Sequence, residues 1–305
     1  MTWATVGSLQ FLWWNTSLSP PVKTLKERAL PDQIDFVISQ IKAIRASYGN
    51  HLIGLGEVSE NNVRAILEGL GDRYLSGIKF ASESKRAIND TALIYDRRSL
   101  LHISKRSFET LHGGRTLKVG DSVSFEVTAN QDLIHVVTSH WPSNMRHGSD
   151  SQRIQMASDL YRSIGNLSGR RDSYVVLMGD FNDDPFSTSL TSHLLATRDR
   201  QLARKKAEFF YNPFWRWIGE SLHDDVVGDE TSICGTHFYR SGKHSRWSTY
   251  DQIIFSSAFL RDQSAVLNEQ RTAIVATSEL RAKVRERSHF DHFPIVSSID
   301  LRKKQ

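Results

Sequence analysis

The 305-residue sequence contains a single cysteine, Cys234. One thiol excludes an internal disulfide framework and is typical of a reducing compartment. No stretch reaches the roughly 18 uninterrupted apolar residues that a membrane-spanning helix needs. The N-terminal stretch MTWATVGSLQFLWWNTS has no basic region and only a short apolar part, so it predicts a first core strand rather than a secretion signal. We therefore expect a soluble protein in the cytoplasm.

Several familiar site signatures are missing as well. The sequence has no Cys/His zinc spacing, no glycine-rich loop of the kind that cradles phosphates, and no G-x-S-x-G elbow. It also has no internal repeat, low-complexity tract or flexible linker, which predicts one domain over residues 1–305. Apolar residues make up 39% of the chain, enough for a sizeable core, and the net charge of +5 slightly favours a polyanionic partner.

Hydrophobic periodicity predicts both helices and strands. Apolar residues three and four apart predict helices over 31–45, 61–70 and 151–164. Between them lie apolar segments that predict strands, and LLHISKRSF, RTLKVG and SVSFEVTA predict a meander with glycine-rich turns. The other expected strands cover 9–14, 51–57, 91–96, 133–142, 174–180, 250–256 and 293–300. Strands thus occur in antiparallel runs and between helices, which predicts a mixed α/β protein with two packed sheets and helices outside.

Polar side chains follow nearly all of the predicted strands. Each one alone is typical of a solvated acid, a helix cap or a packed histidine, but as an ordered set they indicate a site on rigid strand ends. Converging carboxylates repel one another unless a cation lies among them, and oxygen ligands suit Mg²⁺ or Mn²⁺. The set comprises Asn15, Glu57, His140, Asp180, Asn182, Asp251, Asp291 and His292.

The stretch VVLMGDFNDDPFST shows this pattern most clearly, because a buried strand runs directly into acids and an amide. Asp180 and Asn182 are two residues apart on what we expect to be an extended end, so both should project to one side. Asp183 and Asp184 are expected to do only capping work.

The order of these motifs resembles the endonuclease/exonuclease/phosphatase superfamily. GDFNDDP and DHFPI are highly specific to it, whereas LGEVSE and WNT are weak on their own, and the resemblance runs from FLWWNTS to HFDHFPI. Members include pancreatic-type deoxyribonucleases, AP endonucleases, inositol-polyphosphate 5-phosphatases, sphingomyelinases and deadenylases. The resemblance implies an α/β fold, a four-layer α-β-β-α sandwich of two mixed, largely antiparallel sheets flanked by helices.

The resemblance also implies a metal site. Glu57 would be the principal ligand of Mg²⁺ or Mn²⁺, with Asn15 and Asp291 completing or orienting the site. Two positions depart from the family pattern. Gly56 replaces the usual glutamine of Leu-Gln-Glu, and Phe290 precedes the Asp-His motif where serine is common. Neither change removes a reactive group, so we expect altered tuning rather than lost activity.

The same resemblance implies roles around the phosphate. Asp180 would position or deprotonate the attacking water, and Asn182 would hold a non-bridging phosphate oxygen. In SHWPSN, His140 would contact the phosphate with assistance from Asn144.

A second histidine is expected to contact the phosphate as well. His292 would do so with its ring oriented by the carboxylate of Asp251 in STYDQI. A neighbouring carboxylate favours the charged imidazole, so this pair keeps His292 protonated at neutral pH.

One segment, 198–221, does not fit the core pattern, because it is first basic and then strongly aromatic. One interpretation is that its aromatics pack onto the sandwich as an extra helix or flap. The other is a stacking element beside a basic groove, with Arg204, Lys205, Lys206 and Trp215 as substrate contacts.

Three functions are compatible with the sequence. The first is a metal-dependent nuclease, which the basic runs RDRQLARKK, RAKVRERSH and LRKKQ favour, although solvated faces have the same composition. The second is a phosphatase or phospholipase acting on inositol phosphates or a sphingomyelin-type headgroup, with FFYNPFWRWI as a membrane-touching loop. The third is a catalytically silent binding protein of the same fold, which the complete set of acids, amide and histidines disfavours.

Overall fold

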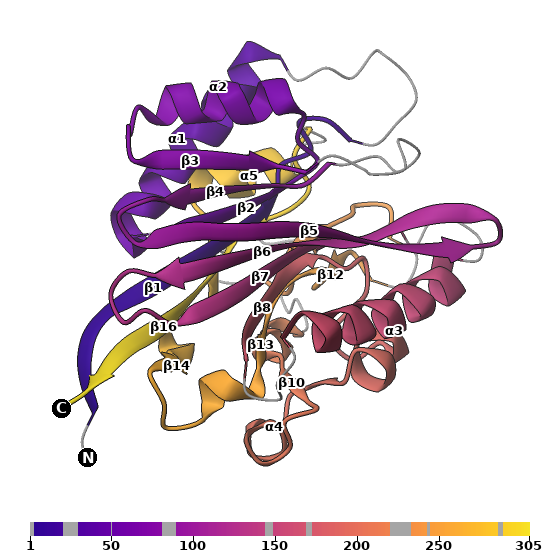
Figure 1. The fold of residues 1–305 in the computed structure, drawn as a ribbon. Helices are drawn as coiled ribbons and strands as arrows, with labels where there is room; N and C mark the ends of the chain where they lie inside the picture. Colours follow the sequence, from indigo (N-terminus) through magenta and orange to yellow (C-terminus); the bar gives the residue numbers. More distant parts are fainter. Residues whose placement is uncertain are drawn as a thin grey trace.

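The computed structural model describes residues 3–20, 30–49, 51–80, 90–143, 149–168, 173–219, 233–242, 245–285 and 289–305. Two seven-stranded sheets pack face to face, and helices cover their outer faces (Figure 1). The α/β sandwich predicted from the sequence is confirmed. Within these ranges, no helix combines the length and the hydropathy needed to cross a membrane.

The first sheet has the strand order β14-β16-β1-β2-β4-β3, and β15 also pairs with β16. Its only parallel pair among the described strands is β1–β2, and this pair directs two strand ends toward the same edge. The strands are β1 (Trp3–Asn15), β2 (Leu52–Gly56), β3 (Leu75–Lys79), β4 (Ala92–Asp96), β14 (Ala265–Leu267), β15 (Ala273–Ile274) and β16 (Ile295–Lys304).

The second sheet has the order β5-β6-β7-β8-β13-β10-β9. β7 and β8 are parallel, and β13 runs antiparallel beside β8. Its strands are β5 (Leu100–His112), β6 (Arg115–Val127), β7 (Leu133–His140), β8 (Tyr174–Asp180), β9 (Ala196–Thr197), β10 (Phe210–Tyr211) and β13 (Asp251–Ser256). A separate small sheet pairs β11 (His237–Phe238) with β12 (Trp247–Ser248).

Helices form where local signals and an apolar face agree. Pro31 begins α1, and the hydroxyl of Ser59 accepts a hydrogen bond from the Asn62 amide at the start of α2. The helices are α1 (Pro31–Tyr48), α2 (Glu60–Leu70), α3 (Ser149–Ser168), α4 (Arg200–Lys205) and α5 (Ser278–Arg285). Shorter helical turns are η1 (Ser189–His193), η2 (Pro213–Trp217), η3 (Ser257–Leu260) and η4 (Glu269–Arg271).

Successive side chains of strand β1 enter two different parts of the core. Phe11 and Trp13 point between the two sheets, whereas Leu12 and Trp14 point toward α1, α2 and α5. All four are fully buried, and burying a large apolar side chain contributes about 1.5–3 kcal/mol. A further cluster lies between α3 and the second sheet. β1 is thus fixed on both faces, which holds its C-terminal end in place.

The predicted meander is correct in outline and wrong in one turn. Gly113 and Gly114 form the β5–β6 hairpin turn with positive φ values of 55° and 75°, as their composition indicates. RTLKVG and SVSFEVTA, however, are a single strand, β6. Gly120 lies inside it because a Cβ there would come within 2.8 Å of Ser139 Oγ on β7.

Candidate active site

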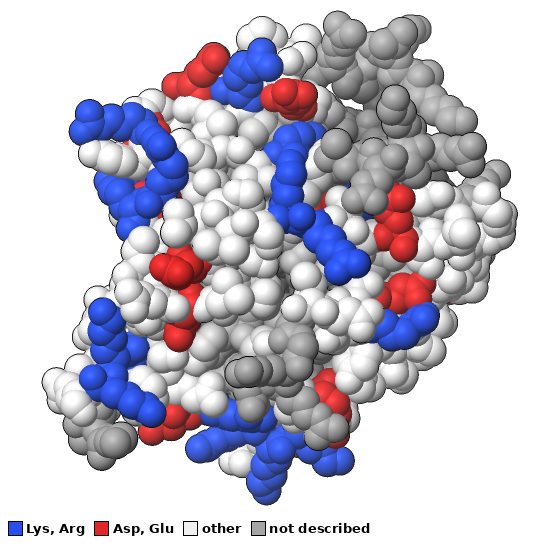
Figure 2. Space-filling model, viewed as in Figure 1, with Lys and Arg blue, Asp and Glu red and all other residues white. Residues whose placement is uncertain are grey.

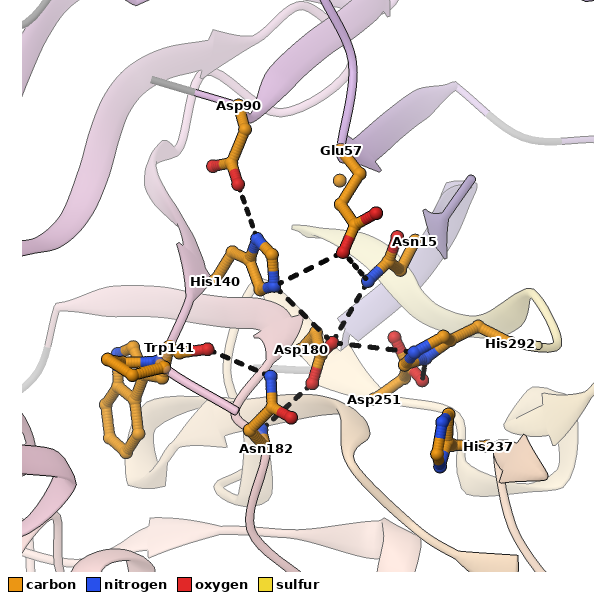
Figure 3. Close-up of polar contacts among 12 residues, drawn as sticks. Asn15, Glu57, Asp90, His140, Trp141, Asp180, Asn182, His237, Asp251 and His292 are labelled. Carbon is orange, nitrogen blue, oxygen red and sulfur yellow. Dashed lines mark hydrogen bonds and ion pairs between the residues drawn. The ribbon is translucent and has the colours of Figure 1, made fainter. Parts of the chain in front are cut away.

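The parallel pairs β1–β2 and β7–β8 end at the same edge of the sandwich. Asn15 ends β1, and its Cα partner on β2 is Gly56, directly before Glu57. On the second sheet, His140, Asp180 and Asp251 lie side by side on β7, β8 and β13. Figure 3 shows these side chains converging on one point. The fold therefore brings together most of the residues predicted from the strand ends.

Asp180 lies at the centre of the site and is almost fully buried. Its Oδ2 accepts a hydrogen bond from Asn15 Nδ2 at 3.0 Å. The same oxygen lies 3.7 Å from Nε2 of His140 and 3.7 Å from Nε2 of His292 (Figure 3). One carboxylate oxygen is thus placed between two imidazoles, where it can hold a water and accept its proton.

His292 is held by Asp251. Asp251 Oδ2 lies 2.7 Å from His292 Nδ1, and Asp251 Oδ1 accepts a hydrogen bond from Trp13 Nε1 at 2.8 Å. Trp14 Nε1 donates to the His292 carbonyl at 3.1 Å. Burial alone would lower the pKa of His292, but Asp251, Asp291 and Asp180 outweigh it and raise that pKa well above its usual value. His292 therefore carries a positive charge at neutral pH.

His140 has a carboxylate partner that the sequence did not reveal. Asp90 Oδ2 lies 2.6 Å from His140 Nδ1. Burial opposes the charged ring, but Asp90, Asp180 and Glu57 raise the pKa of His140 to about 10. Asp90 was missed because it precedes β4 in NDTALIYD, outside any motif. The only available signal was an acid next to a buried strand, which is too common to be diagnostic.

Glu57 follows β2 in a left-handed conformation, with φ of 53°. Such a conformation is unusual for a non-glycine residue and is often found at functional sites. Its Oε1 lies 3.4 Å from Asn15 Nδ2 and 3.8 Å from His140 Nε2. Burial, followed by weaker repulsion from Asp291 and Asp180, raises the pKa of Glu57 against the opposing effect of the two histidines.

The structure explains both departures from the family pattern. A Cβ at Gly56 would lie 3.0 Å from the Trp13 ring, so Trp13 already fills the space that a side chain at position 56 would need. The same tryptophan donates a hydrogen bond to Asp251. Phe290 is buried against Trp14 and Phe36 and serves the core beneath the helices.

Asn182 reaches the site by a turn rather than by the extended end predicted from the sequence. Its φ is 49°, and its backbone N–H donates to Asp180 Oδ1 at 2.9 Å. That hydrogen bond turns the chain just after β8, as Asp side chains often do. Asn182 Nδ2 donates to the Trp141 carbonyl at 2.9 Å, which orients the amide.

Asp183 and Asp184 brace this turn rather than cap a helix. Asp183 accepts from Ser189 and lies 3.0 Å from the buried guanidinium of Arg153. Asp184 Oδ1 accepts from the Thr249 amide at 2.6 Å. The expectation of simple caps is therefore replaced by tertiary contacts.

Asp291 lies at the outer side of the cluster, with 48% of its side chain exposed. Ser17 Oγ donates to it at 3.1 Å, and it lies 3.7 Å from His237 Nε2 and 3.8 Å from His292 Nε2. Partial burial opposes ionisation, but His292 and His237 hold the pKa of Asp291 well below its usual range. His237, stacked on Tyr250, was not identified from the sequence.

The donor set fits a hard divalent cation. Glu57 Oε1 and Asp180 Oδ2 both accept from Asn15 Nδ2, so two carboxylate oxygens lie near one another. Asp180 and Asp291 also raise the pKa of Glu57, a repulsion that a cation would relieve. Among the described residues, two groups of three side chains also have ligand atoms within 4.8 Å of one another: His237, Asp291 and His292, and Asp180, Asp251 and His292. The division of metal ligands among Glu57, Asn15 and Asp291 stays a prediction.

The residues expected to bind substrate are not gathered at this cluster. Arg204 and Lys205 belong to α4, which Lys206 ends and which packs on η3 beyond the C-terminal end of β13. β13 has six residues, so α4 lies at the far end of a strand about 17 Å long. Figure 2 shows basic side chains gathered there, at the bottom of the view. Asn144 lies outside the described residues.

Most aromatics of segment 198–221 pack onto the sandwich, as the packing interpretation expected. Phe210, Tyr211 and Phe214 are buried, and Phe209 and Trp217 pack against the core. Trp215 stays partly exposed on η2. The segment is therefore mainly an added edge of the second sheet, with a few side chains left at the surface.

Solved structures share this fold across nearly their whole length. The human Nocturnin catalytic domain is 14% identical, covers 98% of this chain and 97% of its own, with a TM-score of 0.61. D. rerio TDP2 is 14% identical with 96% and 99% coverage and a TM-score of 0.58. A mannosyl-6-phosphatase from Bacteroides thetaiotaomicron is 12% identical with 95% and 99% coverage and a TM-score of 0.60. No match was found among curated protein sequences.

At these identities the solved structures establish the fold alone. The family model described as "Endonuclease/Exonuclease/phosphatase family" matches residues 23–295, which is most of the chain and includes the GDFN and Asp-His motifs. With this match and the shared fold, the chain belongs to the endonuclease/exonuclease/phosphatase family.

Proposed function

We propose that this protein is a divalent-metal-dependent phosphodiesterase whose substrate is a DNA or RNA strand. Members of its family are hydrolytic phosphoesterases. The observation that carries the proposal is the position of Asp180 between two imidazoles, each paired with its own carboxylate. Glu57 and Asn15 lie beside this centre.

The side chains account for the main requirements of phosphodiester hydrolysis. Asp180 holds the attacking water and accepts its proton at Oδ2. The charged rings of His140 and His292 donate hydrogen bonds from Nε2 to the phosphoryl oxygens, where negative charge builds up. The Asn182 amide, fixed by the Trp141 carbonyl, orients one non-bridging oxygen. A divalent cation at Glu57 and Asn15 would neutralise charge on the phosphoryl group.

Two observations support a nucleic-acid substrate. The chain carries a formal charge of +5, and a basic excess favours binding to a polyanion. TDP2, one of the proteins that share the fold, was solved with a single-strand DNA product. The DNA product belongs to TDP2, and it supports the proposal here because the fold agrees.

A phosphomonoester or a lipid headgroup is the second candidate. The observation that favours it is the shared fold of a mannosyl-6-phosphatase, which acts on a small sugar phosphate. The same charged imidazoles and carboxylates would serve a monoester, whose phosphoryl group carries one ester substituent where a diester carries two. This candidate includes inositol phosphates and sphingomyelin.

The test is a substrate panel with metal-free protein. Single-stranded oligonucleotide, plasmid DNA, inositol phosphates, sphingomyelin and mannose 6-phosphate are incubated with Mg²⁺, with Mn²⁺ or with EDTA. We expect cleavage of a nucleic acid with either metal and none in EDTA. Full activity in EDTA would overturn the metal dependence, and hydrolysis of the small esters alone would overturn the nuclease.

A pair of variants localises the metal. Glu57→Gln should raise the Mg²⁺ concentration for half-maximal activity by about 10-fold or more, since it removes a charged ligand. Glu60→Gln is the matched control, because Glu60 is an exposed acid three residues further along the chain. A cytoplasmic location is a further part of this proposal, and imaging of a tagged protein tests it.

A further inference from the structure

A small aromatic surface lies beside the turn that carries Asn182. Phe186 is exposed to 55%, and its ring centroid lies 6.3 Å from that of Trp215. The guanidinium of Arg198 lies over the Trp215 ring at 4.9 Å. We call these three side chains the ledge.

The turn that presents Phe186 is firmly held. Its neighbour Asp184 accepts from the Thr249 amide, and the Asp183 carbonyl accepts from Gln252 Nε2 at 2.8 Å. Phe186 follows Asn182 by four residues, so the two Cα atoms are at most about 14 Å apart. The turn therefore holds an exposed phenyl ring near the catalytic residues, where a bound ligand would cover it.

Gln252 also connects the other half of the ledge to the active site. Its Oε1 accepts from Asn212 Nδ2 at 2.7 Å, and Asn212 Oδ1 caps the turn that contains Trp215. Because Gln252 follows Asp251 directly, one side chain links Phe186's turn, Trp215's turn and the catalytic strand. The ledge is therefore fixed relative to the strand that carries Asp251.

Arg198 differs from the other arginines around it. Arg200 and Arg216 both pair with Glu269. Arg198 is exposed and has no carboxylate partner among the residues that the structure describes. Its positive charge is thus available to a phosphate beside the aromatic rings.

We propose that the ledge is a substrate subsite, which stacks one nucleobase of a single strand on Phe186 and Trp215 and places Arg198 against a flanking phosphate. This inference rests on the proposed nuclease function. Aromatic faces that alternate with a cation match the chemistry of a single-stranded polynucleotide. A lipid surface would call for a broader apolar face with several cations, whereas the described ledge offers two rings and one arginine.

The first test compares a strand with a substrate that cannot reach the ledge. Phe186→Ala should raise KM for a single-stranded oligonucleotide by about tenfold, the scale of one lost base stack, with little change in kcat. Hydrolysis of a short p-nitrophenyl phosphodiester should stay unchanged, and Phe186→Trp should keep tight binding. Leu101→Ala is the matched control, since Leu101 is equally exposed (54%) on β5.

The second test locates the stacked base. One abasic position is moved along the oligonucleotide, and wild-type KM should rise at one position only. In Phe186→Ala that rise should disappear, because the contact has already been lost. Arg198→Gln should lower the slope of log KM against log salt by about 0.7, as expected for one phosphate contact to a single strand.

The outcomes separate this inference from the proposed function. If the wild type hydrolyses the short diester but no polynucleotide, the nuclease proposal is wrong, and the inference falls with it. If polynucleotide is cleaved, yet Phe186→Ala and the abasic scan leave KM flat, only the ledge proposal is wrong. If Phe186→Ala lost binding to phosphatidylserine vesicles while its KM for the oligonucleotide stayed unchanged, the ledge would be a membrane contact and the subsite proposal would be wrong. The wild-type abasic scan decides the matter even if a variant melts early.

Discussion

The active site has two halves, the His140–Asp90 pair and the His292–Asp251 pair. Their geometry is nearly the same, but different residues hold the two acids in place. His140 and His292 each approach Asp180 Oδ2 to 3.7 Å through Nε2, and each binds a carboxylate through Nδ1. Asp251 is completely buried on a central strand, with Trp13 on its other oxygen. Asp90 lies before β4 in the other sheet, and its side chain is hydrogen-bonded to His140.

The surroundings of the two acids also differ in charge. Burial opposes ionisation of Asp90, but His140, Lys118 and Lys79 outweigh it and lower its pKa. Asp251 has no lysine among the influences on its pKa, and burial raises that pKa. Asp251 is therefore held by His292 and Trp13, whereas Asp90 belongs to a wider charged network. The two histidines lie equally far from Asp180, yet the two acids need not contribute equally to catalysis. The Asp251–His292 pair is buried and has fewer ways to relax when one partner is changed.

The largest effect is expected where the two halves meet. Asp180→Asn removes the carboxylate that both imidazoles share, so kcat should fall by at least about 10²-fold. The side chains have nearly the same shape, so the melting temperature should stay close to wild type. Steady-state kinetics and thermal melting check this. A near-normal rate would show that another group activates the water.

A comparison of the two acids tests their inequality directly. Asp251→Asn should lower kcat by about 10²-fold, because an amide cannot favour the charged His292 ring and still satisfy Trp13. Asp90→Asn should cost less, about tenfold, because the one amide oxygen can still accept from His140, whereas at position 251 it would have to serve both His292 and Trp13. Both rates are measured with saturating Mg²⁺. If both variants lost the same factor in kcat, the two acids would contribute equally and the proposed difference would be wrong.

The alkaline limb of the pH profile sharpens the comparison. The pKa of His140 is raised to about 10, so its charged form persists below that pH and kcat/KM should fall as pH rises through it. Asp90→Asn removes the strongest attraction for that charge while burial still opposes it, so the limb should move to lower pH. A profile of kcat/KM against pH for both proteins checks the direction. If the alkaline limb of Asp90→Asn stayed at the wild-type pH, a group other than His140 would be responsible for it.

The smallest effect is expected at the far end of β13. Replacing Arg204, Lys205 and Lys206 with Glu should leave KM for a short oligonucleotide within about twofold, since distant exposed charges are screened by salt. A long single strand that reaches α4 should bind more weakly, with a lower salt slope. KM for both lengths, at low and moderate salt, separates these cases. A large loss with the short substrate would place α4 closer to the phosphate than we expect.

Much of the fold and of the site was predictable because strand ends are marked by residue type. The apolar segments Leu9–Trp14 and Tyr174–Gly179 predict core strands, and their polar ends predict a site. The GDFN and Asp-His motifs then identify the family. The continuous strand β6 was not predictable, because Gly120 has the signature of a turn and only the neighbouring strand shows why it is a glycine.

The partners of the two histidines mark the limit of the sequence. The sequence determined that acids, amides and histidines would collect at one edge, since their positions follow directly from the strand pattern. Only the tertiary structure decided that Asp90 pairs with His140, that Trp13 binds Asp251, and that Arg204 lies away from the site. These contacts join residues 50 and 238 positions apart in the two hydrogen-bonded pairs. Sequence periodicity reports which face a residue occupies, whereas the packing of the two sheets decides which side chain lies opposite.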